Sequence, residues 1–270
     1  MIEATPAPDG DLKVMAMEAL SDNYVWVLLK DTTHEAVIVD PGEARPVIDW
    51  LESDQGQTYR LAGILVTHHH QDHIGGVAEL VSRYSVKVTG PHQCAGVNVD
   101  SPVGEGDIID VLGHSTRVME TPGHTLDHIV YLVDAATPLL LCGDTLFHAG
   151  CGRLFEGSPA QMQENFARLA QLPEHTLVYG AHEYTMANLR FAAQVEPDNQ
   201  DISRDADAMQ ARREANEPTL PSTIGKELAV NPFMRYEAPT VVQALEAKSG
   251  QVPADNTEAF ALLRQWKDNA

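Results

Sequence analysis

The chain has 270 residues, of which 18 are Lys or Arg and 39 are Asp or Glu, so its formal net charge is −21. A chain of this length buries roughly 70–75 % of its unfolded surface and needs no staple to form a core. The acidic excess argues against binding to nucleic acid, whose phosphates are contacted by many Lys and Arg side chains, and against an anionic membrane surface.

The first two-thirds of the chain read as short strands separated by turns and a few helices. Apolar runs rich in β-branched residues predict the strands, and apolar residues that recur every three or four positions predict the helices. This mixture indicates sheets with helices on their outer faces. The predicted strands are 24–29, 36–39, 63–66, 86–89, 116–119, 128–133 and 139–142, and the predicted helices are 45–52, 72–84 and 159–172.

The character of the sequence changes after Leu172. We therefore predict one domain over residues 1–173 and a second, mainly helical domain over residues 174–270. The last helix of the second domain has Asp255 or Asn256 as its expected N-cap. The predicted elements here are a strand at 176–179, polar helical sequence over 184–216, a proline-containing strap over 217–233 and two short helices, the last near 256–267.

Three cysteines, Cys94, Cys142 and Cys151, are too few and too scattered for a disulfide framework. The chain does not open on the pattern of a signal peptide, and its longest apolar runs are too short to span a bilayer. We expect a reducing, cytoplasmic compartment and no membrane partner. No long apolar edge or heptad demands a protein partner, so we expect a monomer.

The strongest chemical signal is the run T-H-H-H-Q-D-H, which lies between a predicted strand and a predicted helix. His68 and His70 point the same way on an extended segment, whereas His69 points away and is not expected to be a ligand. Asp72 and His73 follow at the turn into the helix. These nitrogen and oxygen donors suit Zn, Fe or Mn. Since the cluster exceeds what one ion needs from one loop, we expect two metals; an exposed polar loop is the alternative interpretation.

Three further loops repeat this placement of a polar donor at the end of an apolar strand. His124 follows the strand at 116–119, Asp144 follows the strand at 139–142, and His182 follows the strand at 176–179. Each residue alone would be typical of a turn or a helix cap. Because loops at one end of a sheet are where sites are built, the three together with the histidine-rich run favour a common metal site.

These motifs resemble the metallo-β-lactamase superfamily and, within it, the glyoxalase II (hydroxyacylglutathione hydrolase) family. The H-x-H-x-D-H motif alone is similar to the whole superfamily. The stretch at 150–157, the H-E-Y-T at 182–185 and the C-terminal segment are specific to the glyoxalase II family. The matching stretches are 20–27, 39–42, 67–76, 121–125, 143–147, 150–157, 182–185 and 231–235.

The resemblance implies an α/β fold, namely a metallo-β-lactamase-like αββα sandwich followed by a smaller α-helical domain. It implies two divalent metal ions per chain, zinc in the first place and iron or manganese as alternatives. It also implies that Asp72 orients the attacking hydroxide. The implied ligands are His68, His70 and His124 for one metal, Asp72, His73 and His182 for the other, and Asp144 as the bridge between them.

The resemblance also implies residues that contact glutathione. They are Arg153, Tyr184, Arg264 and Lys267. Positions 264 and 267 are three apart and share a helix face, so a solvated helix face is the alternative for this pair, as a structural salt bridge is for Arg153. Cys151 is expected to be a packed thiol, because the sequence shows no base beside it.

The implied activity is hydrolysis of S-(2-hydroxyacyl)glutathione thioesters, with S-D-lactoylglutathione giving D-lactate and glutathione in the second step of methylglyoxal detoxification. Such a substrate is an anion, so a local basic cluster must overcome the acidic field of the whole chain. The alternatives are another enzyme on the same scaffold, such as a glutathione persulfide dioxygenase or a lactamase, and a non-catalytic metal-binding protein.

Overall fold

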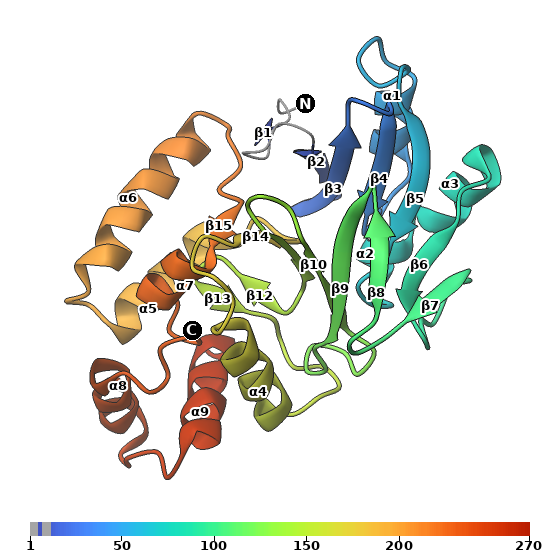
Figure 1. Ribbon diagram of the computed structural model, residues 1–270. Coiled ribbons are helices and arrows are strands. Elements are labelled where there is room, and N and C mark those ends of the chain that lie inside the picture. Colours follow the sequence, from blue (N-terminus) through green and yellow to red (C-terminus); the bar gives the residue numbers. More distant parts are fainter. Residues whose placement is uncertain (1–4, 7–11) are drawn as a thin grey trace. The chain divides into compact units, whose positions relative to one another are not determined.

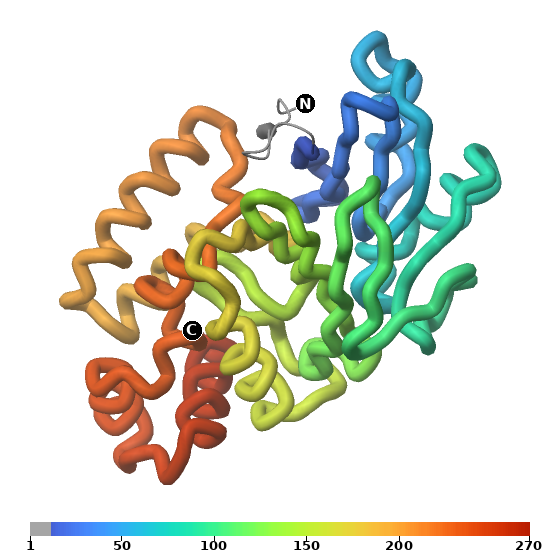
Figure 2. Tube along the Cα trace, in the orientation of Figure 1, coloured from blue at the N-terminus to red at the C-terminus, as the bar shows by residue number. Residues whose placement is uncertain are grey.

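The computed structural model describes residues 5–6 and 12–270 (Figures 1 and 2). The chain divides into two compact units, one of Met1–Glu120 with Asp127–Gly143 and one of Thr121–Leu126 with Asp144–Ala270. These units are defined by how compactly each part of the chain packs, and their limits differ from the domain boundary expected at residue 173. That boundary stays a prediction.

The larger sheet of the first unit has seven strands in sequence order. Pairing is antiparallel from β1 to β4 and parallel from β4 to β7. The parallel half places the ends of β4 and β5 at the same edge of the sheet. The strands are β1 (Thr5–Pro6), β2 (Leu12–Ala19), β3 (Asn23–Lys30), β4 (Glu35–Val39), β5 (Arg60–Leu65), β6 (Val88–Pro91) and β7 (Ser101–Val103).

The central strands of this sheet are buried on both faces. Every side chain of β3 from Asn23 to Leu29 is buried, which is why the strand reads as a continuous apolar run instead of an alternating one. One face packs on the helices α1 (Arg45–Leu51) and α3 (Val77–Tyr84), which supply Val47, Trp50 and Leu80 to a common core.

The helix predicted over 72–84 is in fact two helices, α2 (Gln71–Ile74) and α3, separated by Gly75 and Gly76. A Cβ at Gly75 would lie 2.4 Å from the Gly42 carbonyl oxygen, and a Cβ at Gly76 would lie 2.5 Å from the Ala44 nitrogen. Periodicity alone did not reveal this break, because its cause is a backbone contact with a distant loop.

The first unit also contains four antiparallel strands in the order β11, β10, β9, β8. They are β8 (Ile108–Val111), β9 (His114–Glu120), β10 (Ile129–Val133) and β11 (Leu139–Gly143). The buried Tyr131 hydroxyl of β10 donates to the Val66 carbonyl oxygen at 2.8 Å and ties these strands to the end of β5.

The second unit is mainly helical and includes two short antiparallel pairs. Its helix α9 packs against α4 and α8, and α5 packs against α6. The pairs are β12 (Leu146–Phe147) with β13 (Gly150–Cys151), and β14 (Leu177–Gly180) with β15 (Ser222–Thr223). The helices are α4 (Pro159–Leu169), α5 (Thr185–Val195), α6 (Gln200–Glu214), α7 (Ile224–Val230), α8 (Pro239–Ser249) and α9 (Asn256–Asp268).

Local sequence determines where several of these helices begin. Ser158 and Gln161 form a capping box at the start of α4, with Pro159 in its first turn. Asp255, one of the two expected N-caps, accepts a hydrogen bond from the Glu258 nitrogen at 2.9 Å. The strap predicted over 217–233 contains the unpredicted helix α7, whose cap is Thr223.

An aromatic cluster forms the core between α4 and α9. The ring of Phe260 lies 5.3 Å from that of Phe166, 5.4 Å from that of Phe233 and 6.0 Å from that of Tyr236. Phe166, Phe233 and Phe260 are completely buried. Such pairs add to the free energy of burial because edge and face carry opposite partial charge.

The predicted strands and helices are confirmed within one or two residues at most ends, whereas the short strands β1, β7, β8, β12, β13 and β15 and the long strand β2 were not predicted. Among residues 5–6 and 12–270, no helix combines the length and the hydropathy needed to cross a bilayer.

We expect Phe260→Ala to lower the free energy of unfolding by about 3–5 kcal/mol, because it opens a cavity among packed rings. Urea denaturation measures the change. Val252→Ala removes an exposed apolar side chain of the same unit and should alter the free energy by less than about 0.5 kcal/mol. Equal effects of the two substitutions would contradict this description of the core.

Candidate functional site

The histidine-rich run forms the turn between β5 and α2 in the first unit. His68 and His73 are completely buried. The ring of His68 lies 4.1 Å from that of His73 and 4.7 Å from that of His70. His70 is the extended N-cap residue of α2. The turn therefore brings together His68, His70 and His73, the three imidazoles of the run that were expected to be ligands.

Asp40, at the end of β4, organises this turn. Its carboxylate accepts hydrogen bonds from the Thr67 nitrogen at 2.8 Å, from the Thr67 hydroxyl at 2.7 Å and from Nδ1 of His73 at 3.0 Å. Because the Thr67 hydroxyl hydrogen points to Asp40, the Thr67 oxygen accepts from Nδ1 of His68 at 3.0 Å. Both imidazoles therefore carry a proton on Nδ1, which leaves Nε2 as the nitrogen that can bind a metal ion.

The loop that contains Asp40 is held tightly against the metal-binding turn. Asp40 has a left-handed backbone with φ +51, and its nitrogen donates to the Leu65 carbonyl oxygen at 2.9 Å. A Cβ at Gly42 would lie 2.0 Å from the Asp72 carbonyl oxygen, so this position requires glycine. No role was predicted for Asp40 or Thr67, and the D-P-G motif at 40–42 is the sequence feature that could have indicated one.

Asp72 lies on the first turn of α2, with its carboxylate turned toward His73. Its Oδ2 is 3.6 Å from Nε2 of His73, and its side chain is 39 % exposed. The neighbouring His69 instead bonds Oδ1 of Asp127 through Nδ1 at 2.9 Å.

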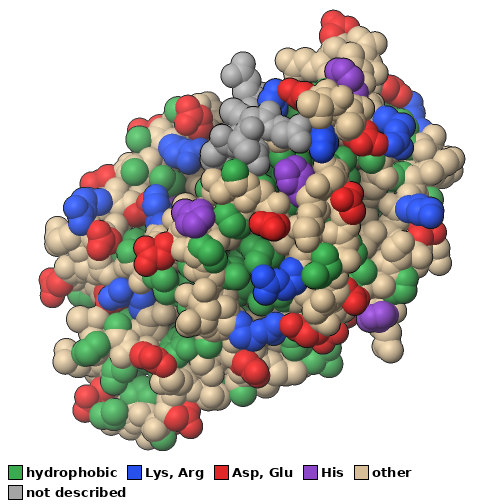
Figure 3. Space-filling model, viewed as in Figure 1, with side chains coloured by type: hydrophobic (Ala, Val, Ile, Leu, Met, Phe, Trp, Pro, Cys, Tyr) green, Lys and Arg blue, Asp and Glu red, His purple; other side chains and the backbone are tan. Residues whose placement is uncertain are grey.

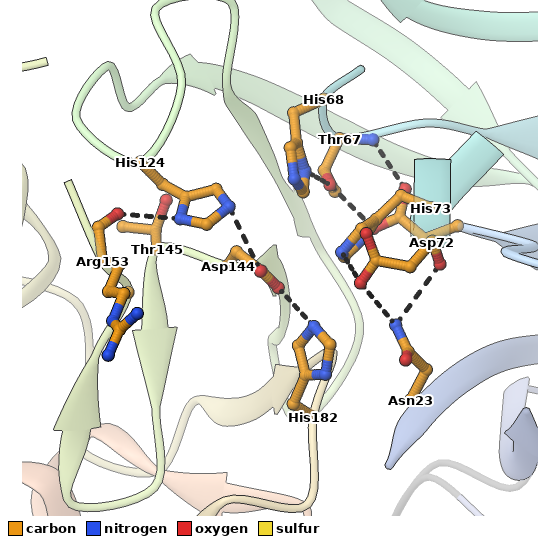
Figure 4. Close-up of polar contacts among 12 residues, drawn as sticks. Asn23, Thr67, His68, Asp72, His73, His124, Asp144, Thr145, Arg153 and His182 are labelled. Carbon is orange, nitrogen blue, oxygen red and sulfur yellow. Dashed lines mark hydrogen bonds and ion pairs between the residues drawn. The ribbon is translucent and has the colours of Figure 1, made fainter. Parts of the chain in front are cut away.

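In the second unit, Asp144 lies between two imidazoles (Figure 4). Its Oδ2 is 3.3 Å from Nε2 of His124, and its Oδ1 is 3.3 Å from Nε2 of His182. All three side chains are buried. Nδ1 of His124 donates to the Arg153 carbonyl oxygen at 2.8 Å, so Nε2 is the nitrogen that faces Asp144 and can bind a metal ion.

This donor set is suitable for divalent metal ions. Asp144 presents one oxygen to each imidazole, as a carboxylate that bridges two ions would, and imidazole nitrogens with carboxylate oxygens are ligands for zinc, iron and manganese. The chemistry of the residues in each unit therefore fits the expected cofactor.

A polar clamp holds the β12–β13 hairpin that follows Asp144. The Asn231 amide donates to the Gly150 carbonyl oxygen at 2.9 Å and to the Glu227 carboxylate at 2.9 Å. Glu227 in turn accepts from the Ala149 nitrogen at 2.8 Å. Glu227 is completely buried, and desolvation raises its pKa. The N-P-F-M-R stretch that begins at Asn231 thus has a structural role that the sequence did not show.

The hairpin is also packed directly on Asp144. A Cβ at Gly152 would lie 1.8 Å from the Asp144 carbonyl oxygen, and the Gly152 nitrogen donates to the Thr145 carbonyl oxygen at 3.2 Å. The Cys151 thiol, between Gly150 and Gly152, is buried, and burial raises its pKa to about 12. It is a packed thiol, as expected.

The four residues expected to contact glutathione all lie in the second unit. Tyr184 stacks on the ring of His182, with centroids 4.6 Å apart and planes 5° apart. The Arg153 side chain is 63 % exposed, and its Nε lies 3.5 Å from Oδ1 of Asp268. Arg264 donates to that same oxygen and to the Cys151 carbonyl oxygen, and its side chain is 7 % exposed.

Lys267 differs from Arg264 in its surroundings. Its Nζ donates to the Ala187 carbonyl oxygen at 3.1 Å and lies 5.1 Å from the centre of the Phe191 ring. Burial, followed by the charges of Arg264 and Arg190, lowers its pKa to about 8. Helix α9 therefore contributes one arginine that braces the 151–153 segment and one lysine that titrates near neutral pH.

Sequence comparisons decide the family. A sequence model described as "Metallo-beta-lactamase superfamily" matches residues 21–93 and 95–182, and one described as "Hydroxyacylglutathione hydrolase C-terminus" matches residues 183–270. The hydroxyacylglutathione hydrolase of Chromohalobacter salexigens is 50 % identical over 257 residues, which are 95 % of this chain and 99 % of that protein. The chain belongs to the hydroxyacylglutathione hydrolase family. The hydroxyacylglutathione hydrolase of Pseudomonas aeruginosa (strain LESB58) is 47 % identical over the same shares of the two chains.

Solved structures confirm the expected fold of this hydroxyacylglutathione hydrolase family member. ETHE1 from Myxococcus xanthus superposes with a TM-score of 0.64 at 24 % identity, covering 94 % of this chain and 99 % of that one. The BLEG-1 B3 metallo-β-lactamase superposes with a TM-score of 0.61 at 23 % identity, covering 83 % and 99 %. The chain therefore has the metallo-β-lactamase fold with a helical C-terminal region.

We expect Asp40→Asn to weaken zinc binding about 10–100-fold, the usual cost of losing a residue that orients metal ligands. The new amide would turn an N–H toward Nδ1 of His73 and so favour the tautomer that carries its proton on Nε2. Titration of the metal-free protein with Zn²⁺ against a chromophoric chelator measures the affinity. Asp49→Asn, an exchange at an exposed carboxylate of α1, is the matched control. Unchanged zinc affinity in Asp40→Asn would remove Asp40 from this role.

Proposed function

We propose that this protein hydrolyses S-(2-hydroxyacyl)glutathione thioesters, with S-D-lactoylglutathione as substrate and D-lactate and glutathione as products. The observation that carries the proposal is the identity of 50 % to a hydroxyacylglutathione hydrolase over 95 % of this chain and 99 % of that relative. The match of residues 183–270 to the family's own C-terminal region supports it further, because that region is the part that distinguishes this family from the wider superfamily.

The ligand assignment is part of this proposal. His68, His70 and His124 would hold one ion; Asp72, His73 and His182 would hold the other; and Asp144 would bridge them. Support comes from the hydrogen bonds at Nδ1 of His68, His73 and His124, which leave each Nε2 able to bind a metal. Zinc is the ion we propose first, since imidazole and carboxylate donors suit it, with iron or manganese as alternatives.

The reaction divides between the cofactor and the chain's own residues. Two divalent ions held by the proposed ligands would supply a hydroxide at neutral pH and would stabilise the negative charge that develops on the thioester oxygen. Asp72 orients the attacking water with its carboxylate. A thiol has a pKa of about 8.5, so the glutathione thiolate leaves without a dedicated acid. Tyr184, which stacks on His182, is proposed to contact the glutathione thioester.

Recognition of glutathione needs local positive charge, because the chain as a whole has a net charge of −21. On the face in Figure 3, acidic and basic side chains are interspersed. We propose that Arg153 and Lys267 bind the glutathione carboxylates, and that Arg264 supports them by fixing Asp268 and the Cys151 carbonyl group. We propose further that the protein's partner is a small-molecule thioester and that the protein acts as a monomer. Because all three cysteines are free thiols, we also propose a reducing, cytoplasmic compartment.

The decisive experiment measures S-D-lactoylglutathione hydrolysis and metal content on the same sample. We expect about two metal ions per chain, cleavage of the thioester, and loss of activity when a chelator removes the metal, with recovery on adding Zn²⁺. A fully metal-loaded protein that leaves the thioester intact, but consumes oxygen in the presence of glutathione persulfide, would overturn the proposal and favour the dioxygenase.

The pH dependence of KM tests the role of Lys267. Its pKa of about 8 means that the ammonium is present below pH 8 and lost above it, so the KM of the wild type should rise as the pH passes through 8. Lys267→Ala should raise KM about tenfold at pH 7, a loss of about 1.4 kcal/mol of binding, with little change in kcat. Its KM should no longer respond to pH near 8, whereas Arg153→Ala should raise KM and keep that response. An unchanged KM in Lys267→Ala would contradict the assignment.

A further inference from the structure

The side chain of Asn23 contacts Asp72 in a way that neither the motif nor the proposed ligand set requires. Asn23 is the first residue of β3 and is 6 % exposed. Its Nδ2 donates to Oδ2 of Asp72 at 3.0 Å and to the Asp72 carbonyl oxygen at 3.3 Å (Figure 4). Both acceptors are oxygens without hydrogen, so the chemistry itself requires the NH₂ group to face Asp72.

These two hydrogen bonds fix the conformation of Asp72. One nitrogen bridges the main-chain oxygen and the carboxylate of the same residue, so rotation about either side-chain torsion of Asp72 would break a contact. The Asp72 side chain is 39 % exposed, and a carboxylate at such a position otherwise samples several rotamers, whose loss opposes binding. The Asn23 amide thus restricts the rotamers of Asp72 before a metal ion binds, so less conformational entropy is lost on binding.

Asn23 is itself held rigidly. It pairs with Ala19 across the β2–β3 hairpin, and Leu20 in the connecting turn has φ +53. The Leu20 nitrogen donates to Oε1 of Glu43 at 2.9 Å. The loop that contains Glu43 also packs on Asp72 through Gly42, so donor and acceptor are positioned from one segment.

We propose that Asn23 is a positioning residue that holds the Asp72 carboxylate ready for metal binding. This inference rests on the proposed function, in which Asp72 is a metal ligand, and it gives a role to the L-S-D-N stretch at 20–23. Asn23 acts through Asp72 and touches neither substrate nor reacting atoms.

The test uses Asn23→Asp and Asn23→Leu, which keep the size of the side chain and remove the donor. The metal-free full-length proteins are titrated with Zn²⁺ against a chromophoric chelator. We expect one of the two zinc ions, the one assigned to Asp72, to bind about 10–100-fold less tightly in both variants, with the other ion little affected. Asn23→Gln, which restores an amide, should recover part of the affinity. Ser21→Ala, in the same turn and bonded only to Asp22 among the described contacts, should bind zinc as the wild type does.

Thermal unfolding of the metal-free proteins separates positioning from simple structural support. We expect midpoints close to that of the wild type, and a fall in kcat with unchanged KM when zinc is limiting. Wild-type zinc affinity in both variants would overturn the inference, as would a loss of affinity that only parallels a lower metal-free midpoint. The titration needs no substrate. A wild type that does not cleave lactoylglutathione would therefore contradict the proposed function, while the zinc affinities would still test the role of Asn23.

Discussion

The protonation pattern of buried imidazoles is the constraint on which the rest of the candidate site depends. A histidine can bind a metal only through a nitrogen that has no proton, and in the first unit Asp40 enforces this for two histidines at once, directly at His73 and through Thr67 at His68. The cost of burying the Asp40 carboxylate is offset by three donors. Asp40 and Thr67 lie close together because the parallel strands β4 and β5 end at the same edge of the sheet.

In the second unit, a backbone carbonyl group determines which nitrogen of His124 carries a proton. His124 donates its Nδ1 proton to the Arg153 carbonyl oxygen, so the segment proposed to bind glutathione also fixes a proposed metal ligand. The hairpin before Arg153 depends on the buried Glu227 and Asn231, and the segment after Asp144 on the close approach of Gly152. The proposed glutathione contact and the proposed metal ligand of this unit are therefore connected directly, because the backbone of Arg153 holds the His124 ring.

The sequence could indicate the candidate metal ligands because their signal is local in type and placement: an imidazole or carboxylate directly after an apolar strand. It could not predict Asp40, Asn23 or Glu227 as supporting residues, because each acts through a partner far along the chain and resembles an ordinary turn or helix residue. The break in the helix at Gly75 and Gly76 was missed for the same reason. Arg264 and Lys267 lie on the same helix face, but their surroundings differ in a way that sequence spacing does not reveal. Arg264 is buried and bonds the Cys151 carbonyl oxygen, whereas Lys267 has a pKa lowered to about 8.

The glycine contacts around the metal-binding turn have a consequence for how this scaffold can change. Gly42, Gly75 and Gly76 each face backbone atoms at distances that exclude any side chain, so the loop at 40–44 and the turn into α2 tolerate almost no variation in size. New substrates must then be accommodated by segments that lack this restriction, such as the exposed Arg153 and the helices of residues 183–270. A library for directed evolution would accordingly diversify the C-terminal region and keep the turn of the first unit invariant, and natural divergence within the superfamily is expected to follow the same division.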